Sequence, residues 1–164
     1  MAAPKRKPGS KADKAPNARI LVVEARFYND IADELLSGCT RALGEAGASW
    51  DVVTVPGSLE IVPAIAIAVD AAAKQKKSYD GAVALGCVIQ GETFHFDIVS
   101  MQSARALIDY SVQHQFPCGN GILTVDTEPQ AWARARVAEQ NKGGEAARAA
   151  LSLITLKRAS AKTK

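Results

Sequence analysis

The sequence predicts an α/β protein, a three-layer α/β/α sandwich in which helices cover both faces of a four-stranded parallel sheet. Short apolar segments of strand length alternate along the chain with longer segments whose apolar residues recur at helical spacing. Some strand segments are apolar at nearly every position, which is typical of strands buried on both faces of a parallel sheet. At 164 residues, this alternation indicates one domain of ordinary size.

The first half of the chain contains two strand–helix units. A strand is expected at 19–25 and a helix at 29–47, where apolar residues recur every three to four positions. A second strand is expected at 49–55. The helix expected at 57–76 is rich in Ala and apolar around most of its circumference, so it should be largely buried. Pro63 is compatible with this helix only in or near its first turn.

The second half continues the alternation. The expected elements are a strand at 81–89, a helix at 96–115, a turn at 117–121, a strand at 121–125, a short helix at 128–136, a break at 138–144 and a last helix at 145–156. Asp126 or Thr127 can cap the short helix, and Pro129 suits its first turn.

The formal net charge of +3 is unevenly distributed. Residues 1–19 carry six Lys or Arg against one Asp, residues 157–164 carry four and no acid, and the body between them has ten basic and sixteen acidic residues. The expected organisation is a disordered basic arm at 1–17, a single domain at 18–157 and a basic tail at 158–164. A basic tail can contact nucleic acid, but the Lys, Pro and Ala composition favours solvated disorder, so no nucleic-acid partner is expected.

Targeting signals and metal-binding spacings are absent from the sequence. No apolar segment follows the basic N-terminus and no uncharged run reaches membrane-spanning length, so neither a signal peptide nor a membrane partner is expected. Cys39, Cys87 and Cys118 form no CxxC pair. They are interpreted as free thiols in a reducing cytosol, which predicts a cytoplasmic protein without a metal.

The most informative stretch is 81–99, where a buried strand ends in a glycine turn that carries Thr93 and His95. Chemistry in open α/β sheets collects at the carboxyl ends of the strands. Gly91 permits a sharp turn and close approach of a ligand, and a helix beginning near His95 directs free N–H groups to the same place. An anion site beside an acid–base histidine is therefore predicted. Considered without the other motifs, His95 is better explained as a surface histidine that caps a helix.

Five segments in this order together resemble 6,7-dimethyl-8-ribityllumazine synthase: RFYND, VPGSLEI, LGCVIQGETFHFDIV, GILTVDT and NKGGEAA. The resemblance implies a flavodoxin-like sheet and a homopentamer with active sites at subunit interfaces. It implies a transferase of riboflavin biosynthesis that condenses 5-amino-6-(D-ribitylamino)uracil with 3,4-dihydroxy-2-butanone 4-phosphate. The products are 6,7-dimethyl-8-ribityllumazine, phosphate and water, and no cofactor or metal takes part.

The resemblance assigns His95 the acid–base role and gives the phosphate to Glu92, Thr93 and Arg134, with Arg134 reaching in from the neighbouring subunit. A guanidinium suits a phosphate better than an ammonium does. Many members have Ala where this chain has Glu92, so only the Glu92 amide is expected to contribute. The simpler alternatives are a helix cap for Thr93 and a solvated helix charge for Arg134.

The resemblance also implies a substrate pocket lined by Phe27, Ser58, Leu59, Glu60, Cys87, Val88, Ile89, Asn120 and Lys142. Phe27 would stack on the pyrimidinedione ring, and Ser58 and Glu60 would hold the ribityl hydroxyls. Helix capping is the alternative for Ser58. Cys87 is expected to contribute apolar and backbone contacts rather than a nucleophile, because burial raises the pKa of a thiol. Lys142 would contact a ring carbonyl, or be a charge at the C-terminus of a helix.

Two positions depart from the family pattern. Asn120 stands where many members place a Phe from the adjacent subunit, and Ala138 stands where a second Lys is common. Asn120 can hydrogen-bond the ring edge but cannot stack on it. Because His95 and Arg134 are present, activity is expected; a non-catalytic paralogue that binds lumazine or flavin is the alternative. A dinucleotide-binding dehydrogenase is excluded, since no G-x-G-x-x-G follows the first strand.

Overall fold

The structure is a computed structural model that describes residues 14–162. Its elements are β1 (Arg19–Ala25), α1 (Asn29–Glu45), β2 (Ser49–Val55), the 3-10 helix η1 (Ser58–Glu60), α2 (Ile61–Lys74), β3 (Gly81–Ile89), α3 (His95–His114), β4 (Cys118–Val125), α4 (Glu128–Ala135) and α5 (Lys142–Lys162).

The four strands form one parallel sheet in the order β2-β1-β3-β4. The chain crosses from β1 outward to β2, returns to β3 beside β1, and continues to β4. This order is that of the first four strands of a flavodoxin-like sheet. The predicted α/β/α sandwich with a four-stranded parallel sheet is therefore confirmed.

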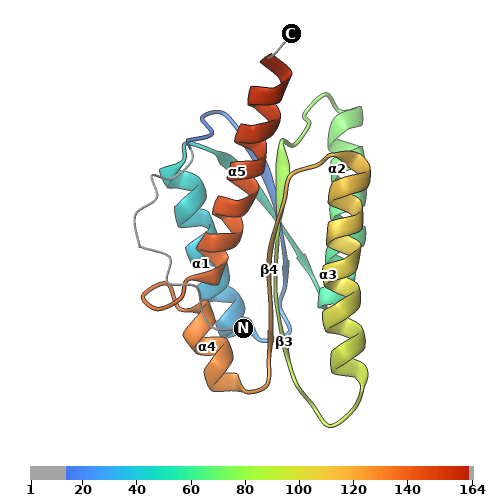
Figure 1. Cartoon of the computed structure of the whole chain (residues 1–164), viewed down its shortest axis with the longest axis vertical. Helices are drawn as coiled ribbons and strands as arrows, with labels where there is room; N and C mark the ends of the chain where they lie inside the picture. Colours follow the sequence, from blue (N-terminus) through green and yellow to red (C-terminus); the bar gives the residue numbers. More distant parts are fainter. Residues whose placement is uncertain (1–13, 163–164) are drawn as a thin grey trace.

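Each face of the sheet has its own core. Along β1, Ile20 and Val22 face one cluster of buried residues, while Leu21 and Val23 face the other, as the two-residue period of a strand requires. The first cluster lies under α1, α4 and α5, and the second under α2 and α3. Figure 1 shows these two helix layers on opposite sides of the sheet. Burial of alternate apolar side chains on both faces explains why the strand segment at 81–89 is apolar almost throughout.

The turn predicted at 117–121 is wrong, because β4 already begins at Cys118. The glycines there allow close packing rather than a turn. A Cβ added to Gly119 would lie 2.0 Å from the carbonyl oxygen of Ala146, so only glycine lets α5 approach this strand. The contact joins two segments that are distant in the sequence.

The last helix is longer than predicted at both ends. Its first residues were expected within the break at 138–144, yet α5 begins at Lys142 because Gly143 packs against α1. A Cβ on Gly143 would lie 2.0 Å from the carbonyl oxygen of Leu35. At the other end, α5 continues to Lys162, so most of the predicted basic tail is helical. Residues 163–164 lie outside the described residues.

The helix expected to be largely buried is only half covered. In α2 the buried residues are Ile61, Val62, Ile65 and Ala72, whereas Ile67 is 71% exposed. Pro63 lies in the first turn of α2, as predicted. A helix that packs on one sheet face buries one side only, so the prediction from its all-round apolar character is wrong for a single chain.

The predicted disordered arm at 1–17 is described only from residue 14 onward. Ala15 is 1% exposed and belongs to the first core cluster, and the Asn17 N–H donates to the carbonyl of Gly47 at 3.2 Å. Ala15 is therefore packed against the sheet domain, whereas Lys14, Pro16 and Asn17 are exposed, and the rest of the predicted arm, residues 1–13, lies outside the described residues. No helix within residues 14–162 has the length and apolar character needed to cross a membrane.

Candidate functional site

The carboxyl ends of all four parallel strands lie at one edge of the sheet, at the bottom of Figure 1. Four connections leave this edge: 26–28 after β1, 56–60 after β2, 90–94 after β3 and 126–127 after β4. Parallel pairing therefore brings Phe27, η1 and the N-terminus of α3 to the same side of the molecule.

The connection after β3 is open to solvent. Glu92, Thr93 and His95 are all exposed, and His95 is the first residue of α3. The first hydrogen bonds of the helix are donated by Asp97 and Ile98 to the carbonyl of Phe94, so the preceding N–H groups lie ahead of the hydrogen-bonded part of α3. Such N–H groups, with the positive end of the helix dipole, are suited to an anion.

Thr93 does not cap α3. The N-cap residue is Phe94, and the helix has no side-chain cap, so the capping alternative for Thr93 is not supported. Gly91 does not have a positive φ, so the turn here does not depend on a conformation that only glycine adopts readily. Within residues 14–162, no atom beyond its two chain neighbours lies within 4 Å of a Cβ added to Gly91. The space beside it is therefore left open by the protein.

The segment after β2 contributes Ser58, Leu59 and Glu60 from η1, which packs against α3, β3 and β1. Ser58 is buried, and its Oγ lies against Gly86 of β3, where an added Cβ would be 2.9 Å away. Capping by Ser58 is not supported, because the N-cap of η1 is Gly57 and no side chain caps it. Leu59 and Glu60 are exposed beside it.

Phe27 is 72% exposed, so it is not part of the core. Among residues 14–162, its ring contacts the ring of Tyr28, edge to face at 5.0 Å. Tyr28 packs on the first core cluster. The pKa of Tyr28 is raised, mainly by burial and to a smaller extent by the nearby Cys87 thiol. An exposed ring at the end of a buried strand has a free face for a planar ligand.

The residues of β3 that lead into the site become less buried toward its end. Cys87 is buried, whereas Val88 and Ile89 are half-buried. Burial raises the pKa of the Cys87 thiol to about 12, so it stays protonated at neutral pH and is unsuited to be a nucleophile, as the sequence predicted.

Asn120 is not brought to this edge. It pairs with Ala84 in the middle of the sheet, five residues before Val125 at the end of β4, which corresponds to about 16 Å along the strand. Its Oδ1 accepts a hydrogen bond from the Ile122 N–H at 3.0 Å. Asn120 lines a hollow of about 330 Å³ between α3 and β4, beside the unpartnered buried hydroxyl of Ser100.

Arg134 and Lys142 lie on the opposite face of the sheet from α3. Arg134 is half-buried in the last turn of α4 and donates to the carbonyl of Gln130 at 3.0 Å. Lys142 pairs with Glu145 at 2.6 Å. Lys142 begins α5, so the alternative that made it a charge at a helix C-terminus is wrong. Within one chain, neither residue has a recorded contact with the groups around His95.

Within residues 14–162, no three His, Cys, Asp or Glu side chains are grouped so that they could hold a metal ion. Two comparisons decide the family. The model described as 6,7-dimethyl-8-ribityllumazine synthase matches residues 17–158. The chain belongs to the 6,7-dimethyl-8-ribityllumazine synthase family.

Curated relatives with this name, that of a transferase of riboflavin biosynthesis, support the family over almost the whole chain. The relative from Nitrobacter hamburgensis is 59% identical over 162 residues, and the alignment covers 99% of both chains. A relative from Rhodopseudomonas palustris, named 6,7-dimethyl-8-ribityllumazine synthase 1, is 57% identical with the same coverage. One from Methylorubrum extorquens is 60% identical over 157 residues, covering 96% of this chain and 91% of the relative. The resemblance inferred from the five motifs is confirmed.

Sequence reasoning missed two charged residues at the candidate site of this family member. Glu24 is a buried carboxylate near the end of β1, and Arg26 is its ion-pair partner in the loop that carries Phe27. A signal was available, because an acidic residue interrupts the apolar strand RILVVEA two positions before an arginine. Buried carboxylates need a partner, so this spacing pointed to the pair.

Proposed function

We propose that this chain catalyses the condensation of 5-amino-6-(D-ribitylamino)uracil with 3,4-dihydroxy-2-butanone 4-phosphate. The products are 6,7-dimethyl-8-ribityllumazine, phosphate and water, in riboflavin biosynthesis. The observation that carries the proposal is 59% identity, along 99% of both chains, to a relative named for this reaction. The arrangement of Phe27, η1 and His95 around one open sheet edge supports it.

In the proposed reaction, the free amine of the pyrimidinedione attacks the ketone to form an imine, and phosphate is then eliminated. Tautomerisation and ring closure by the ribitylamine nitrogen follow. His95 moves the protons these steps require, since imidazole both accepts and donates a proton near neutral pH. The N–H groups ahead of α3 and the Thr93 hydroxyl receive the phosphate. Orienting two substrates side by side can supply roughly 7–11 kcal/mol of the rate enhancement.

The ring and its ribityl chain are proposed to bind along the strand ends. The exposed ring of Phe27 stacks on the heterocycle, Ser58 and Glu60 hydrogen-bond the ribityl hydroxyls, and the segment from Cys87 to Ile89 lines the ring pocket. Three free cysteines support a reducing compartment, so the cytoplasm is proposed as the site of the reaction.

We further propose a homopentamer whose active sites lie between subunits. Within one chain, Asn120 lies in the middle of β4 and Arg134 lies on the sheet face opposite α3, and this separation from His95 supports a role for both in a neighbour's site. Large apolar side chains are exposed on α2, before α3 and along it: Ile67, Phe94, Met101, Ile108 and Val112. Exposed apolar surface of this extent is typical of subunit interfaces.

Light scattering tests this assembly. A pentamer has a mass of about 87 kDa, five times the 17.3 kDa of one chain. A particle of one chain would contradict the shared site, and a particle of megadalton mass would contradict a free pentamer.

The catalytic proposal is tested by mixing the protein with both substrates and following lumazine fluorescence together with phosphate release. His95→Ala is expected to slow product formation while leaving residual turnover, because substrate orientation is kept. His114→Ala is the matched control, since His114 lies at the other end of α3 against Tyr110. A normal rate for His95→Ala would refute the role of this histidine. Product at the uncatalysed rate with tight lumazine binding would instead identify a non-catalytic carrier.

A further inference from the structure

A buried carboxylate lies near the end of β1, just before the loop that carries Phe27. Glu24 is 3% exposed, and both of its oxygens accept hydrogen bonds from Nη1 of Arg26 at 3.2 Å. The hydroxyl of Thr54 on β2 donates to the same carboxylate at 3.0 Å. Glu24 therefore ties the end of β1 to the end of β2, and an ionised carboxylate at this depth requires its arginine.

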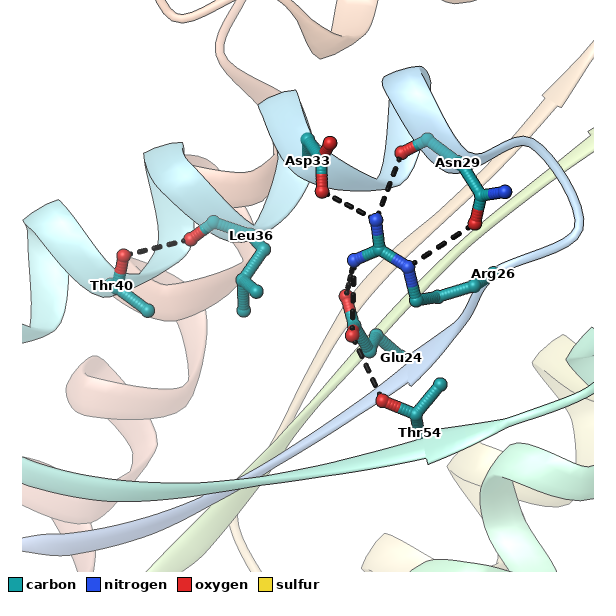
Figure 2. Close-up of polar contacts among 7 residues, drawn as sticks. All are labelled: Glu24, Arg26, Asn29, Asp33, Leu36, Thr40 and Thr54. Atoms are coloured by element: carbon teal, nitrogen blue, oxygen red, sulfur yellow. Dashed lines mark hydrogen bonds and ion pairs between the residues drawn. The ribbon is translucent and has the colours of Figure 1, made fainter.

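The other side of the same guanidinium is bound to α1. Arg26 Nε donates to Oδ1 of Asn29 at 3.3 Å, Nη2 donates to the Asn29 carbonyl at 3.3 Å, and Nη2 also pairs with Asp33. Figure 2 shows the guanidinium between Glu24 and the start of the helix. The hydrogen bond with Asp33 is the main cause of the raised pKa of Arg26. All three guanidinium nitrogens have partners within the chain.

The segment between these two attachments carries Phe27. Arg26 fixes its start through the Glu24 carboxylate, and Asn29 fixes its end at the first residue of α1. Phe27 itself is 72% exposed, and in the described part of the chain the one ring that it contacts is that of Tyr28. Since so little packs on this ring, its position depends on the backbone that the guanidinium holds.

We propose that Arg26, clamped between Glu24 and Asp33, is a positioning residue that fixes the loop presenting Phe27 to the substrate ring. Arg26 does not contact the substrate and acts through Phe27, so this inference rests on the proposed stacking role of Phe27. The planar fork of arginine makes the three-sided attachment possible, whereas lysine offers a single ammonium.

The test is the dissociation constant of 6,7-dimethyl-8-ribityllumazine, measured by its fluorescence on the assembled protein. Four proteins are compared: the wild type, Arg26→Gln, Phe27→Ala and the double variant. Each single substitution is expected to weaken binding about fivefold, the fold-change that loss of an aromatic stacking contact gives. The double variant is expected to bind no more weakly than Phe27→Ala, because Arg26 has no ring left to position. The dissociation constant of inorganic phosphate should not change.

Arg41→Gln is the matched control. It removes an exposed ion pair between Arg41 and Glu45 of α1, away from the carboxyl ends of the strands, and should leave lumazine binding unchanged. If Arg26→Gln does not fold, Arg26→Lys keeps the charge while losing the fork, and is expected to show the same selective weakening. Thermal unfolding identifies which variants are folded.

The outcomes separate this inference from the proposed function. Unchanged binding in folded Arg26→Gln or Arg26→Lys, with weaker binding in Phe27→Ala, would overturn the positioning role and leave the stacking role intact. Independent losses that multiply in the double variant would also overturn it. Unchanged binding in Phe27→Ala would remove the stacking role and the positioning role together.

Discussion

Mixing two impaired variants tests whether His95 and Arg134 of different subunits share one active site. His95 begins α3 and Arg134 lies in the last turn of α4, and Figure 1 shows these two helices on opposite faces of the sheet. We therefore expect that His95→Ala and Arg134→Ala, each impaired alone, complement each other when they are unfolded together and reassembled in equal amounts.

The expected recovery follows from the ring geometry. In a cyclic assembly each site takes one residue from a subunit and the other from its neighbour. With random assembly at equal amounts, one half of the sites have an intact His95 and one half of those an intact Arg134. About a quarter of the wild-type activity should therefore return, above the residual activity of the separate variants.

The control is wild-type protein reassembled with the double variant His95→Ala/Arg134→Ala. Shared sites again give about a quarter of the wild-type activity, whereas sites built within one chain give about half. Lumazine formation is measured by fluorescence in both mixtures. If the two single variants together show no more activity than the mean of each alone, while the control gives half, the shared-site reasoning is refuted.

Three further predictions concern stability and ligand binding. Gly119→Ala should lower the free energy of unfolding by about 1–3 kcal/mol in denaturant titrations, because its Cβ would meet a backbone oxygen at 2.0 Å. Gly91→Ala should change the free energy of unfolding by less than about 0.5 kcal/mol, because the space beside Gly91 is open. Equal destabilisation by Gly119→Ala and Gly91→Ala would contradict the packing argument. Burial raises the pKa of Cys39 to about 12, above that of an unfolded thiol near 9. The stabilisation that comes from keeping this thiol neutral is therefore complete below about pH 9 and is lost as the pH rises toward 12. The free energy of unfolding should fall less steeply with pH over that range in Cys39→Ala than in the wild type, and identical slopes in the two proteins would contradict this. Asn120→Phe should bind lumazine about fivefold more tightly, since the adjacent hollow of about 330 Å³ leaves room for a ring that can stack. Weaker binding in titrations would show that the Asn amide contributes more than stacking.

Much of the candidate site could be predicted from the sequence because its residues follow strand ends. Parallel pairing brings such residues to one edge whatever else packs on the sheet, so the places of Phe27, Ser58 and His95 after successive strands suffice to bring them to that edge. Asn120 and Arg134 entered only through the family resemblance. Their separation from His95 within one chain appeared once the register of β4 and the face covered by α4 were known.

The sequence by itself determined the order of elements and the parallel sheet with its two buried faces, because periodicity records how each segment is buried. It determined the family through five motifs that occur in the family's order. Only the tertiary structure decided what the glycines do. Gly119 lies where α5 packs on β4, and Gly143 lies where α5 packs on α1, so neither glycine forms a turn. The tertiary structure also decided that Ala15 is buried and that Thr54 on β2 donates a hydrogen bond to the Glu24 carboxylate. These features depend on which distant segments come into contact, and no local pattern of residues encodes a partner that lies far away along the chain.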